Sequence, residues 1–299
     1  MSNPVFNNSA VFADPRTRKQ RARAGQPGAT TAQPGYLDGY YTGQPQQQTG
    51  PTSTVDATTL DQMYGAPAAT TRDTGRMTYD DVIVKTGGLL ALLVVVAAAT
   101  WWVTPQMPAL YMIGAVVGLV LGLVNSFKKN PSPALIIAYT VAEGVFLGGI
   151  SYLFQNIYIA QESAQPIVLQ AVLGTFATFG AALFLFKSGR VRVTPKFTRW
   201  LMVALVGYLA FSVLNLVLSF FMGGDFGPLR SGWIGVLVGL VAVGLAAASL
   251  IMDFDSIKRG VEGGAPAKFA WSAAFGLIVT LVWLYLEILR ILAILQGRD

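Results

Sequence analysis

Four acidic residues interrupt the long apolar stretches of this chain, and they are the side chains best able to do chemistry: Glu143 in the third stretch, Asp253 and Asp255 at the end of the sixth, and Glu287 deep in the seventh. Arg290 is the only strong cation well inside a predicted span. Ionisable groups are costly to bury at membrane depth, so each of these residues is a candidate functional group.

Carboxylates in such surroundings can respond to protons or bind a cation. Burial disfavours their charged form and a second carboxylate nearby disfavours it further, so a pair would be proton-sensitive. Carboxylate and carbonyl oxygens are also the ligands that calcium prefers. The chain has no EF-hand-like loop, so we expect weak calcium binding at most, with no dedicated metal site and no cofactor.

Spacing limits how these groups can be arranged. Asp253 and Asp255 are two residues apart, about 200° around a helix, so one should face the bundle and the other the cytoplasm or the headgroups. The alternative for both is a solvated helix end. Glu287 and Arg290 are three apart and share a face, so an ion pair that locks the bundle competes with a proton-sensitive role. For Glu143 the structural alternative is a hydrogen bond to a Ser, Thr or Asn of a facing helix.

Seven apolar runs must position these residues: 82–103, 108–127, 134–154, 167–186, 200–222, 233–252 and 269–295. A helix needs about 20 residues to cross a hydrocarbon core of roughly 30 Å. None of the runs shows the period of two that lipid-facing barrel strands require. Because helices satisfy their own backbone hydrogen bonds, the sequence predicts an all-α membrane protein with a seven-helix transmembrane bundle in contact with the lipid bilayer.

Composition and charge narrow the function. Hydrophobic residues make up 53% of the chain, and cysteine and histidine are absent, which excludes disulfides, imidazole metal ligands and histidine-based triads. Serine and threonine show no base-oriented nucleophile spacing, so we do not expect an enzyme. Basic residues concentrate before the first run and in the second, fourth and sixth connections. The positive-inside rule therefore predicts a cytoplasmic N-terminus and an external C-terminus, and the net charge of +6 does not indicate nucleic-acid binding.

Residues 1–76 form a segment of different composition, rich in Pro, Gly, Gln, Thr and Ala. Such a segment cannot bury enough apolar surface to fold, so we predict a disordered, low-complexity cytoplasmic tail ahead of a transmembrane domain at 77–299. An adaptor role or a contact with anionic lipid through the basic residues at 16–23 is the alternative. We expect order to begin at Thr78, an N-cap followed by Asp80 and Asp81 in the first turn.

Glycines spaced four apart mark three of the predicted helices, at Gly114, Gly118 and Gly122, at Gly144 and Gly148, and at Gly235 and Gly239. Small residues let membrane helices approach closely. We expect these stripes to face neighbouring helices of the bundle, with oligomerisation as the alternative.

Three short motifs resemble those of the Bax-inhibitor family of membrane proteins, in its bacterial YccA-like branch. Helix six ends on Asp-Ser-Ile at 255–257, where the family has Asp-Thr-Gln, and the last helix carries Leu-Tyr-Leu-Glu at 284–287, where the family has Leu-Tyr-Leu-Asp. Helix three carries Glu-Gly-x-x-Leu-Gly at 143–148. The resemblance spans residues 78–295 and implies a bacterial plasma membrane protein in which six helices surround the last one.

The resemblance also implies a pair of acidic side chains linked to pH-sensitive calcium leak. By position these are Asp255 and Glu287, while Asp253 has no counterpart in the motif. A helix that began at Phe269 would place Glu287 about 27 Å along it, too far for a direct pair. We therefore expect residues 268–275 to lie along the cytoplasmic interface and the span to begin near Gly276, with Glu287 about 16 Å deep.

The leading hypothesis is a pH-sensitive leak channel for calcium or other cations, gated by these carboxylates. Ionisation of both would separate the last two helices, and a shared proton would close them. If the two carboxyls do not meet, Arg290 is the expected partner of Glu287, and Lys258 or Arg259 that of Asp255. The alternatives are an interaction protein that modulates a membrane protease or a stress response, and a proton-coupled transporter for a small solute.

Overall fold

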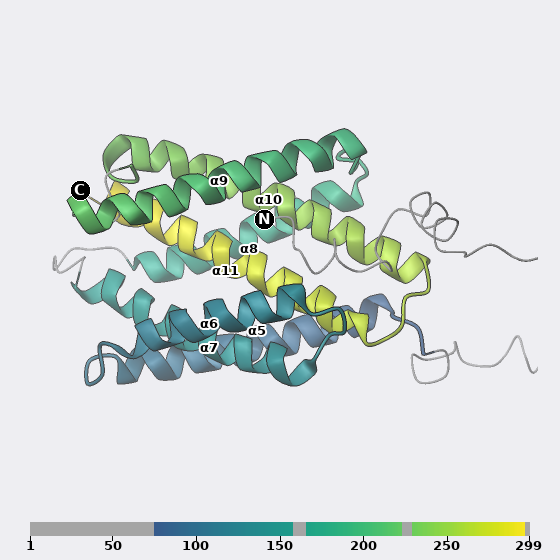
Figure 1. The fold of residues 1–299 in the computed structure, drawn as a ribbon, viewed down its shortest axis with the longest axis horizontal. Coiled ribbons are helices and arrows are strands. Elements are labelled where there is room, and N and C mark those ends of the chain that lie inside the picture. The colour runs from purple at the N-terminus through teal and green to yellow at the C-terminus, as the bar shows by residue number, and fades with distance from the viewer. Residues whose placement is uncertain (1–74, 158–165, 223–228, 297–299) are drawn as a thin grey trace, which may run out of the picture. The chain divides into compact units, whose positions relative to one another are not determined.

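A computed structural model describes residues 75–157, 166–222 and 229–296. Within them, seven helices are long and apolar enough to span a membrane, and they are shown in Figure 1: α5 (Tyr79–Val103), α6 (Leu110–Phe127), α7 (Pro133–Tyr152), α8 (Ile167–Lys187), α9 (Pro195–Met222), α10 (Gly232–Glu262) and α11 (Phe269–Leu295). A short π-helix, η1 (Leu153–Ile157), follows α7. The predicted all-α seven-helix membrane bundle is confirmed, whereas the tail predicted for residues 1–76 lies outside the described residues, apart from Gly75 and Arg76.

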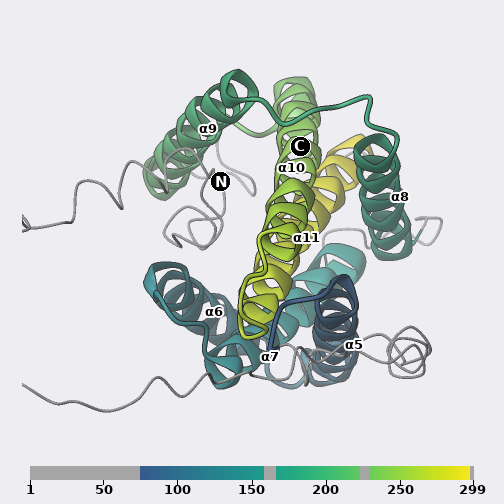
Figure 2. The same ribbon diagram turned by 90° about the vertical axis from the view of Figure 1, so that its right-hand side faces the viewer.

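The last helix is the central one. Of an 18-residue apolar stretch in α11, 72% is buried, against 17% in α6 and in α9. Helices α5, α7, α8 and α10 all pack against α11, and Figure 2 shows it crossing the middle of the bundle beneath α10. Helix α11 is covered over more of its apolar stretch than any other described span, although α5, α9 and α10 have a higher mean hydropathy.

The first two turns of α11 differ from the sequence prediction. Residues 269–275 do not lie along an interface but begin a continuous helix, so that prediction was wrong. Ala270, Ala273 and Ala274 are completely buried, and the Phe275 ring packs edge-on against Tyr139 with centroids 4.9 Å apart. The small side chains allow α7 and α10 to approach this part of α11, and close packing replaces exposure to headgroups.

Helix α10 also extends beyond its apolar run. The run ends at Met252, whereas the helix ends at Glu262, so Asp253 and Asp255 stand inside a helix rather than at its end. The added turns are held by ion pairs four residues apart, of which Arg259 with Asp255 is the closest at 2.5 Å. Pairs at this spacing stabilise a helix, and they continue α10 where its hydrophobicity stops.

The start of α5 is tied to the connection between α10 and α11. The Met77 N–H donates to the Ala265 carbonyl over 2.7 Å, and the Ala267 N–H donates to the Gly75 carbonyl over 2.9 Å. Thr78 then begins the helix with a capping box to Asp81, which confirms the predicted N-cap. We call the segment 75–77 the strap, because its backbone is hydrogen-bonded to the connection between α10 and α11.

The glycine stripes serve packing within the bundle. A Cβ atom added at Gly118 would lie 2.8 Å from the Glu143 carboxylate, and one at Gly144 would lie 2.8 Å from Val96. Every stripe glycine has a neighbour on another helix or on the segment before its own helix: Gly114, Gly118, Gly122, Gly144, Gly148, Gly235 and Gly239. The prediction that the stripes face neighbouring helices is confirmed.

Candidate functional site

Asp253 is the carboxylate through which α10 contacts α11. It is 1% exposed, and the Thr280 hydroxyl donates to Asp253 Oδ2 over 2.8 Å. The Gly276 carbonyl oxygen is a second acceptor for the same hydroxyl, at 3.2 Å. A hydroxyl has one hydrogen to donate, so Thr280 serves one of these acceptors at a time.

Asp253 also differs from Asp255 and Glu287, because it has no cationic partner among the described residues. No lysine or arginine in the part of the chain that the structure describes forms an ion pair with it. Asp255 points elsewhere: it pairs with Arg259, and 19% of its side chain is exposed. Asp253 therefore faces the bundle and Asp255 its margin, as the helical geometry predicts. Of the two cations expected as partners of Asp255, Lys258 and Arg259, the structure shows Arg259.

A second polar group lies farther along α11, and we call it the Glu287 cluster. Its members come from three parts of the chain: Trp283, Glu287 and Arg290 of α11, Tyr208 and Ser212 of α9, and Arg230 just before α10. Glu287 is 4% exposed and Arg290 is 7% exposed. These side chains join α9 to the central helix near the end of the bundle where α11 terminates.

Hydrogen bonds and ion pairs occupy both oxygens of the Glu287 carboxylate. Oε2 forms an ion pair with Arg290, the partner that the three-residue spacing predicts. Oε1 accepts from the Tyr208 hydroxyl and from the Trp283 indole over 3.3 Å. It also faces Arg230 Nη2 at 3.5 Å. The carboxylate is therefore fully engaged, with two guanidinium groups for one negative charge.

Arg230 and Tyr208 are functional candidates that the sequence did not reveal. Arg230 donates to the Ser212 hydroxyl over 2.8 Å and to the Tyr208 hydroxyl, and its guanidinium lies 5.1 Å from the centre of the Tyr208 ring. In the sequence, Arg230 is a single cation in a connection that should lie outside. A lone basic residue against the positive-inside pattern is the signal that could have pointed to a buried role.

The structure does not bring Asp255 and Glu287 together. Thr280 is level with Asp253, and Glu287 lies seven residues farther along α11, which is about 10 Å at 1.5 Å per residue. Asp255 lies two residues from Asp253 in the opposite direction, because α10 and α11 run antiparallel, and this adds about 3 Å. Asp255 instead pairs with Arg259, and Glu287 pairs with Arg290 and Arg230.

Glu143 stands apart from both groups. It is 9% exposed on α7 and packs against Gly118 of α6, where a Cβ atom would lie 2.8 Å from its Oε1. Tyr139 lies one turn earlier on the same helix. Its neighbours are thus a glycine and a tyrosine rather than the Ser, Thr or Asn that the structural alternative named.

The carboxylates are spread out rather than gathered into a chelating set. Across residues 75–157, 166–222 and 229–296, no group of three or more His, Cys, Asp or Glu side chains could hold a metal ion. Calcium takes 6–8 oxygen ligands in a stable site. The carboxylates on α10 and α11 stand singly, with Thr280 at Asp253, Arg259 at Asp255 and two arginines at Glu287.

Comparison with known proteins identifies a family for this chain. No curated protein matches the chain. The family model described as Bax inhibitor 1 like matches residues 3–297, which is nearly the whole sequence. With seven membrane-spanning helices in its described part, the last of them central, this chain belongs to the Bax inhibitor 1 like family.

Proposed function

We propose that this protein is a pH-sensitive cation leak, with calcium as the preferred ion, and that the described arrangement is its closed state. We place it in the YccA-like branch of the family, in a bacterial plasma membrane with its N-terminus in the cytoplasm. The observation that carries the proposal is the contact between Asp253 and Thr280, in which a buried carboxylate that forms no ion pair with a described lysine or arginine joins α10 to the central helix.

The Thr280 hydroxyl can serve both protonation states of Asp253. With Asp253 neutral, its O–H donates to Thr280 Oγ1, and the hydroxyl of Thr280 donates to the Gly276 carbonyl oxygen 3.2 Å away. With Asp253 ionised, Thr280 must turn its hydrogen toward the carboxylate, and the Gly276 carbonyl loses that donor. Loss of one proton therefore rearranges the hydrogen bonds between α10 and α11.

An ionised Asp253 also leaves a negative charge without a compensating cation among the described residues. A buried charge without a partner is strongly unfavourable, and water or a cation entering between the helices would relieve it. In this proposal the proton lost from Asp253 both loosens the contact between α10 and α11 and creates the site that attracts the ion.

We propose that the ion passes along α11 from Asp253 toward the Glu287 cluster, and that this cluster blocks the path at the end of the bundle where α11 terminates. Arg230 and Arg290 place two positive charges around one carboxylate, so a cation approaching this end is repelled. Glu287 can attract a cation only when one of these arginines moves away. In this proposal Asp253 is the proton-sensitive group, a role that the resemblance gave to Asp255. Glu287 remains ion-paired with Arg230 and Arg290.

The test of the leak itself is ion flux from liposomes. The purified full-length chain is reconstituted with a calcium-sensitive dye inside, and efflux of calcium, potassium and chloride is compared with that of protein-free liposomes. We expect calcium and potassium to leak faster than in the controls and chloride not to. Fluxes equal to those of protein-free liposomes across the pH range would refute the proposal.

A second candidate function is that of an interaction protein whose tail engages a membrane protease. The strap favours it, because the backbone of residues 75–77 is bonded to the connection between α10 and α11, so a partner pulling on the tail acts on the central helices. Deleting residues 1–74 separates the candidates. Loss of protease association with leak unchanged would support the interaction role, and unchanged association would exclude it.

A further inference from the structure

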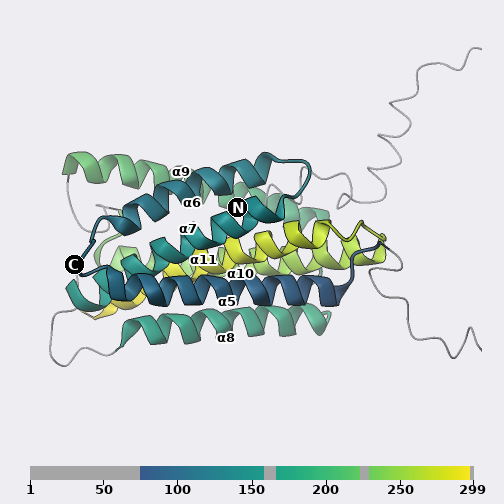
Figure 3. The ribbon, with the colours of Figure 1, turned by 90° about the horizontal axis from the view of Figure 1, so that it is seen from below.

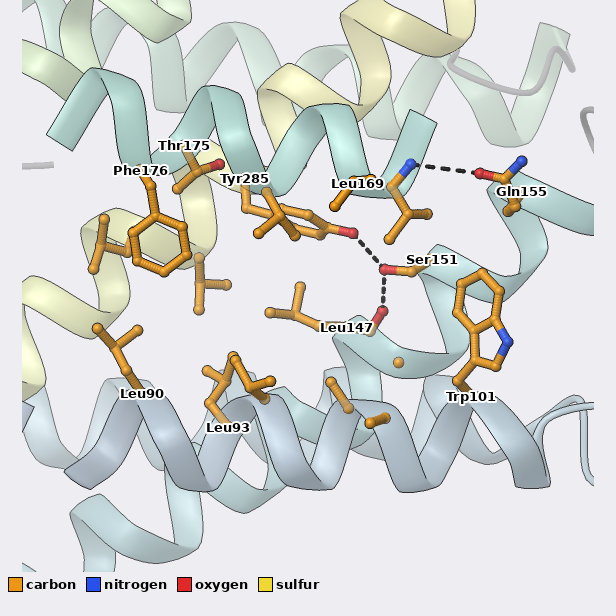
Figure 4. Close-up of a pocket in the computed structure, with 18 of the residues that line it drawn as sticks. Leu90, Leu93, Trp101, Leu147, Ser151, Gln155, Leu169, Thr175, Phe176 and Tyr285 are labelled. Carbon is orange, nitrogen blue, oxygen red and sulfur yellow. Dashed lines mark hydrogen bonds between the residues drawn. The ribbon is translucent and has the colours of Figure 1, made fainter. Parts of the chain in front are cut away.

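A laterally open groove of about 700 Å³ lies between α5, α7, α8 and α11, and Figure 4 shows its lining. Its floor is formed by buried residues of α7 and α11, among them Leu147, Leu281 and Val282. Its rim is at least half exposed, from 51% to 77%, at Val94, Trp102, Leu169 and Phe176. A buried floor with an exposed rim describes a groove that opens to the side of the bundle.

The opening lies between α5 and α8 (Figures 2 and 3), which stand as neighbours with α11 behind them. Helix α5 packs against α7 and α11, and α8 packs against α10 and α11. Both flanking helices are membrane spans, so the opening faces the hydrocarbon of the bilayer rather than water.

The length of the groove matches one leaflet. On α5 its lining runs from Leu90 to Trp102, a rise of twelve residue steps, or about 18 Å. Half of a hydrocarbon core of roughly 30 Å is about 15 Å. Trp101 and Trp102 end the groove one or two residues before α5 itself ends, at the level where tryptophan gathers in membrane proteins.

Polar groups collect at this same end. Ser151 and Tyr285 share a hydrogen bond of 2.6 Å, and Gln155 accepts from the Val168 N–H over 3.5 Å. Figure 4 shows these side chains on the side of Trp101, while Leu90 and Phe176 lie at the opposite, apolar end. Because Ser151 donates to the Leu147 carbonyl, Tyr285 donates to Ser151, and the Gln155 amide N–H2 group is the donor of these three side chains that can serve an acceptor on a ligand at the interface.

We propose that this groove binds one acyl chain of a phospholipid from the surrounding bilayer, with the ester region of the lipid against Ser151, Gln155 and Tyr285. The occupant follows from the surroundings. The groove is apolar, has about the length of a leaflet and opens to hydrocarbon. Its polar side chains lie at the interfacial end, apart from Thr175, whose hydroxyl donates to the Ala171 carbonyl of its own helix, and this distribution has the chemistry of a lipid. The volume of the groove lies within the range of about 300–1,000 Å³ that is usual for ligand pockets. The site is separate from the carboxylates of the proposed leak.

The experiment is native mass spectrometry of the full-length protein purified in mild detergent, followed by lipid extraction. We expect the wild-type chain to retain one phospholipid. Ala98→Phe fills the groove from α5, because Ala98 lines it, and should lose the lipid. Ala99→Phe is the matched control, since Ala99 is an exposed residue of the same helix turn outside the lining, and should keep it.

A second pair of variants approaches from α8 and keeps the test decisive if Ala98→Phe fails to fold. Leu169→Trp narrows the groove, and Leu173→Trp, at a comparably exposed position that does not line it, is its control. Loss of lipid in Leu169→Trp alone supports the site. A wild-type protein without phospholipid, equal retention in the filled and control variants, or retention of a molecule without an acyl chain would each overturn it.

Discussion

Asp253 and Glu287 are buried to a similar degree on the same pair of helices, yet their surroundings are opposite. Asp253 is 1% exposed and is hydrogen-bonded by one threonine. Glu287 is 4% exposed and has two arginines, a tyrosine and an indole around it. The comparison teaches that depth alone does not make a carboxylate proton-sensitive. The balance of charge around it decides whether a proton or an arginine neutralises it.

The comparison is most sharply tested by removing one carboxylate charge from each region. Glu287→Gln leaves two buried guanidinium groups without a carboxylate, and removing one partner of a buried ion pair costs about 3–5 kcal/mol. We expect a loss of stability of that order, measured by denaturant unfolding in detergent micelles. Asp255→Asn is the control, because its ion pair is partly exposed and worth about 0–1 kcal/mol. Equal losses in the two variants would break the distinction.

A pair of glycines on α10 probes the packing that holds Arg290 in place. A Cβ atom at Gly239 would lie 2.8 Å from Ile291 Cδ1 and 3.4 Å from Arg290 Nη2, whereas one at Gly244 would meet nothing within 4 Å. Overpacking costs about 1–3 kcal/mol, so Gly239→Ala should lower stability and Gly244→Ala should not. The same unfolding measurement applies, and a harmless Gly239→Ala would show that α10 does not confine the arginine.

The proposed barrier in the Glu287 cluster can be weakened without touching a carboxylate. Arg230→Gln removes one positive charge, and a unit charge about 10 Å away contributes roughly 1–2 kcal/mol at an effective dielectric constant of 20. We expect calcium efflux from liposomes to rise about tenfold. Arg230→Lys keeps the charge and should stay near the wild-type rate. A leak unaffected by Arg230→Gln would remove the cluster from the proposed path.

The smallest effect is expected at the hydroxyl that faces Asp253. Thr280→Val removes the group that exchanges acceptors, and a net hydrogen bond in such a setting is worth about 1 kcal/mol. We expect the midpoint of the pH profile of efflux to move in Thr280→Val, because one protonation state loses more than the other. Thr280→Ser retains the hydroxyl and should keep the wild-type midpoint. An unchanged midpoint in both variants would separate Thr280 from the proton response.

The sequence was sufficient for features that depend on local spacing. Apolar length placed the spans, the turn of a helix separated Asp253 from Asp255, and the three-residue spacing predicted the pairing of Glu287 with Arg290. It was not sufficient where partners are distant. Arg230 meets Glu287 across 57 residues of chain, and nothing in its local sequence indicates that it turns toward α9.

The misplaced ends of the last two helices have a common cause. Hydropathy ends α10 at Met252, but ion pairs and buried side chains such as Phe254 and Ile257 continue the helix to Glu262. Likewise, Lys268 and the aromatic residues after it have the composition of an interface, but the alanines among them allow burial against α10. Composition describes the average surroundings of a segment, whereas packing depends on which of its faces meets another helix.

The most direct test is the pH dependence of calcium efflux from liposomes that contain the wild-type protein, Asp253→Asn or Asp255→Asn. In the proposed mechanism the opening step is loss of the proton from Asp253. Efflux should therefore increase with pH in the wild type and in Asp255→Asn, and it should not vary with pH in Asp253→Asn. An Asp253→Asn protein whose efflux rises with pH as in the wild type would contradict the assignment of Asp253 as the proton-sensitive group.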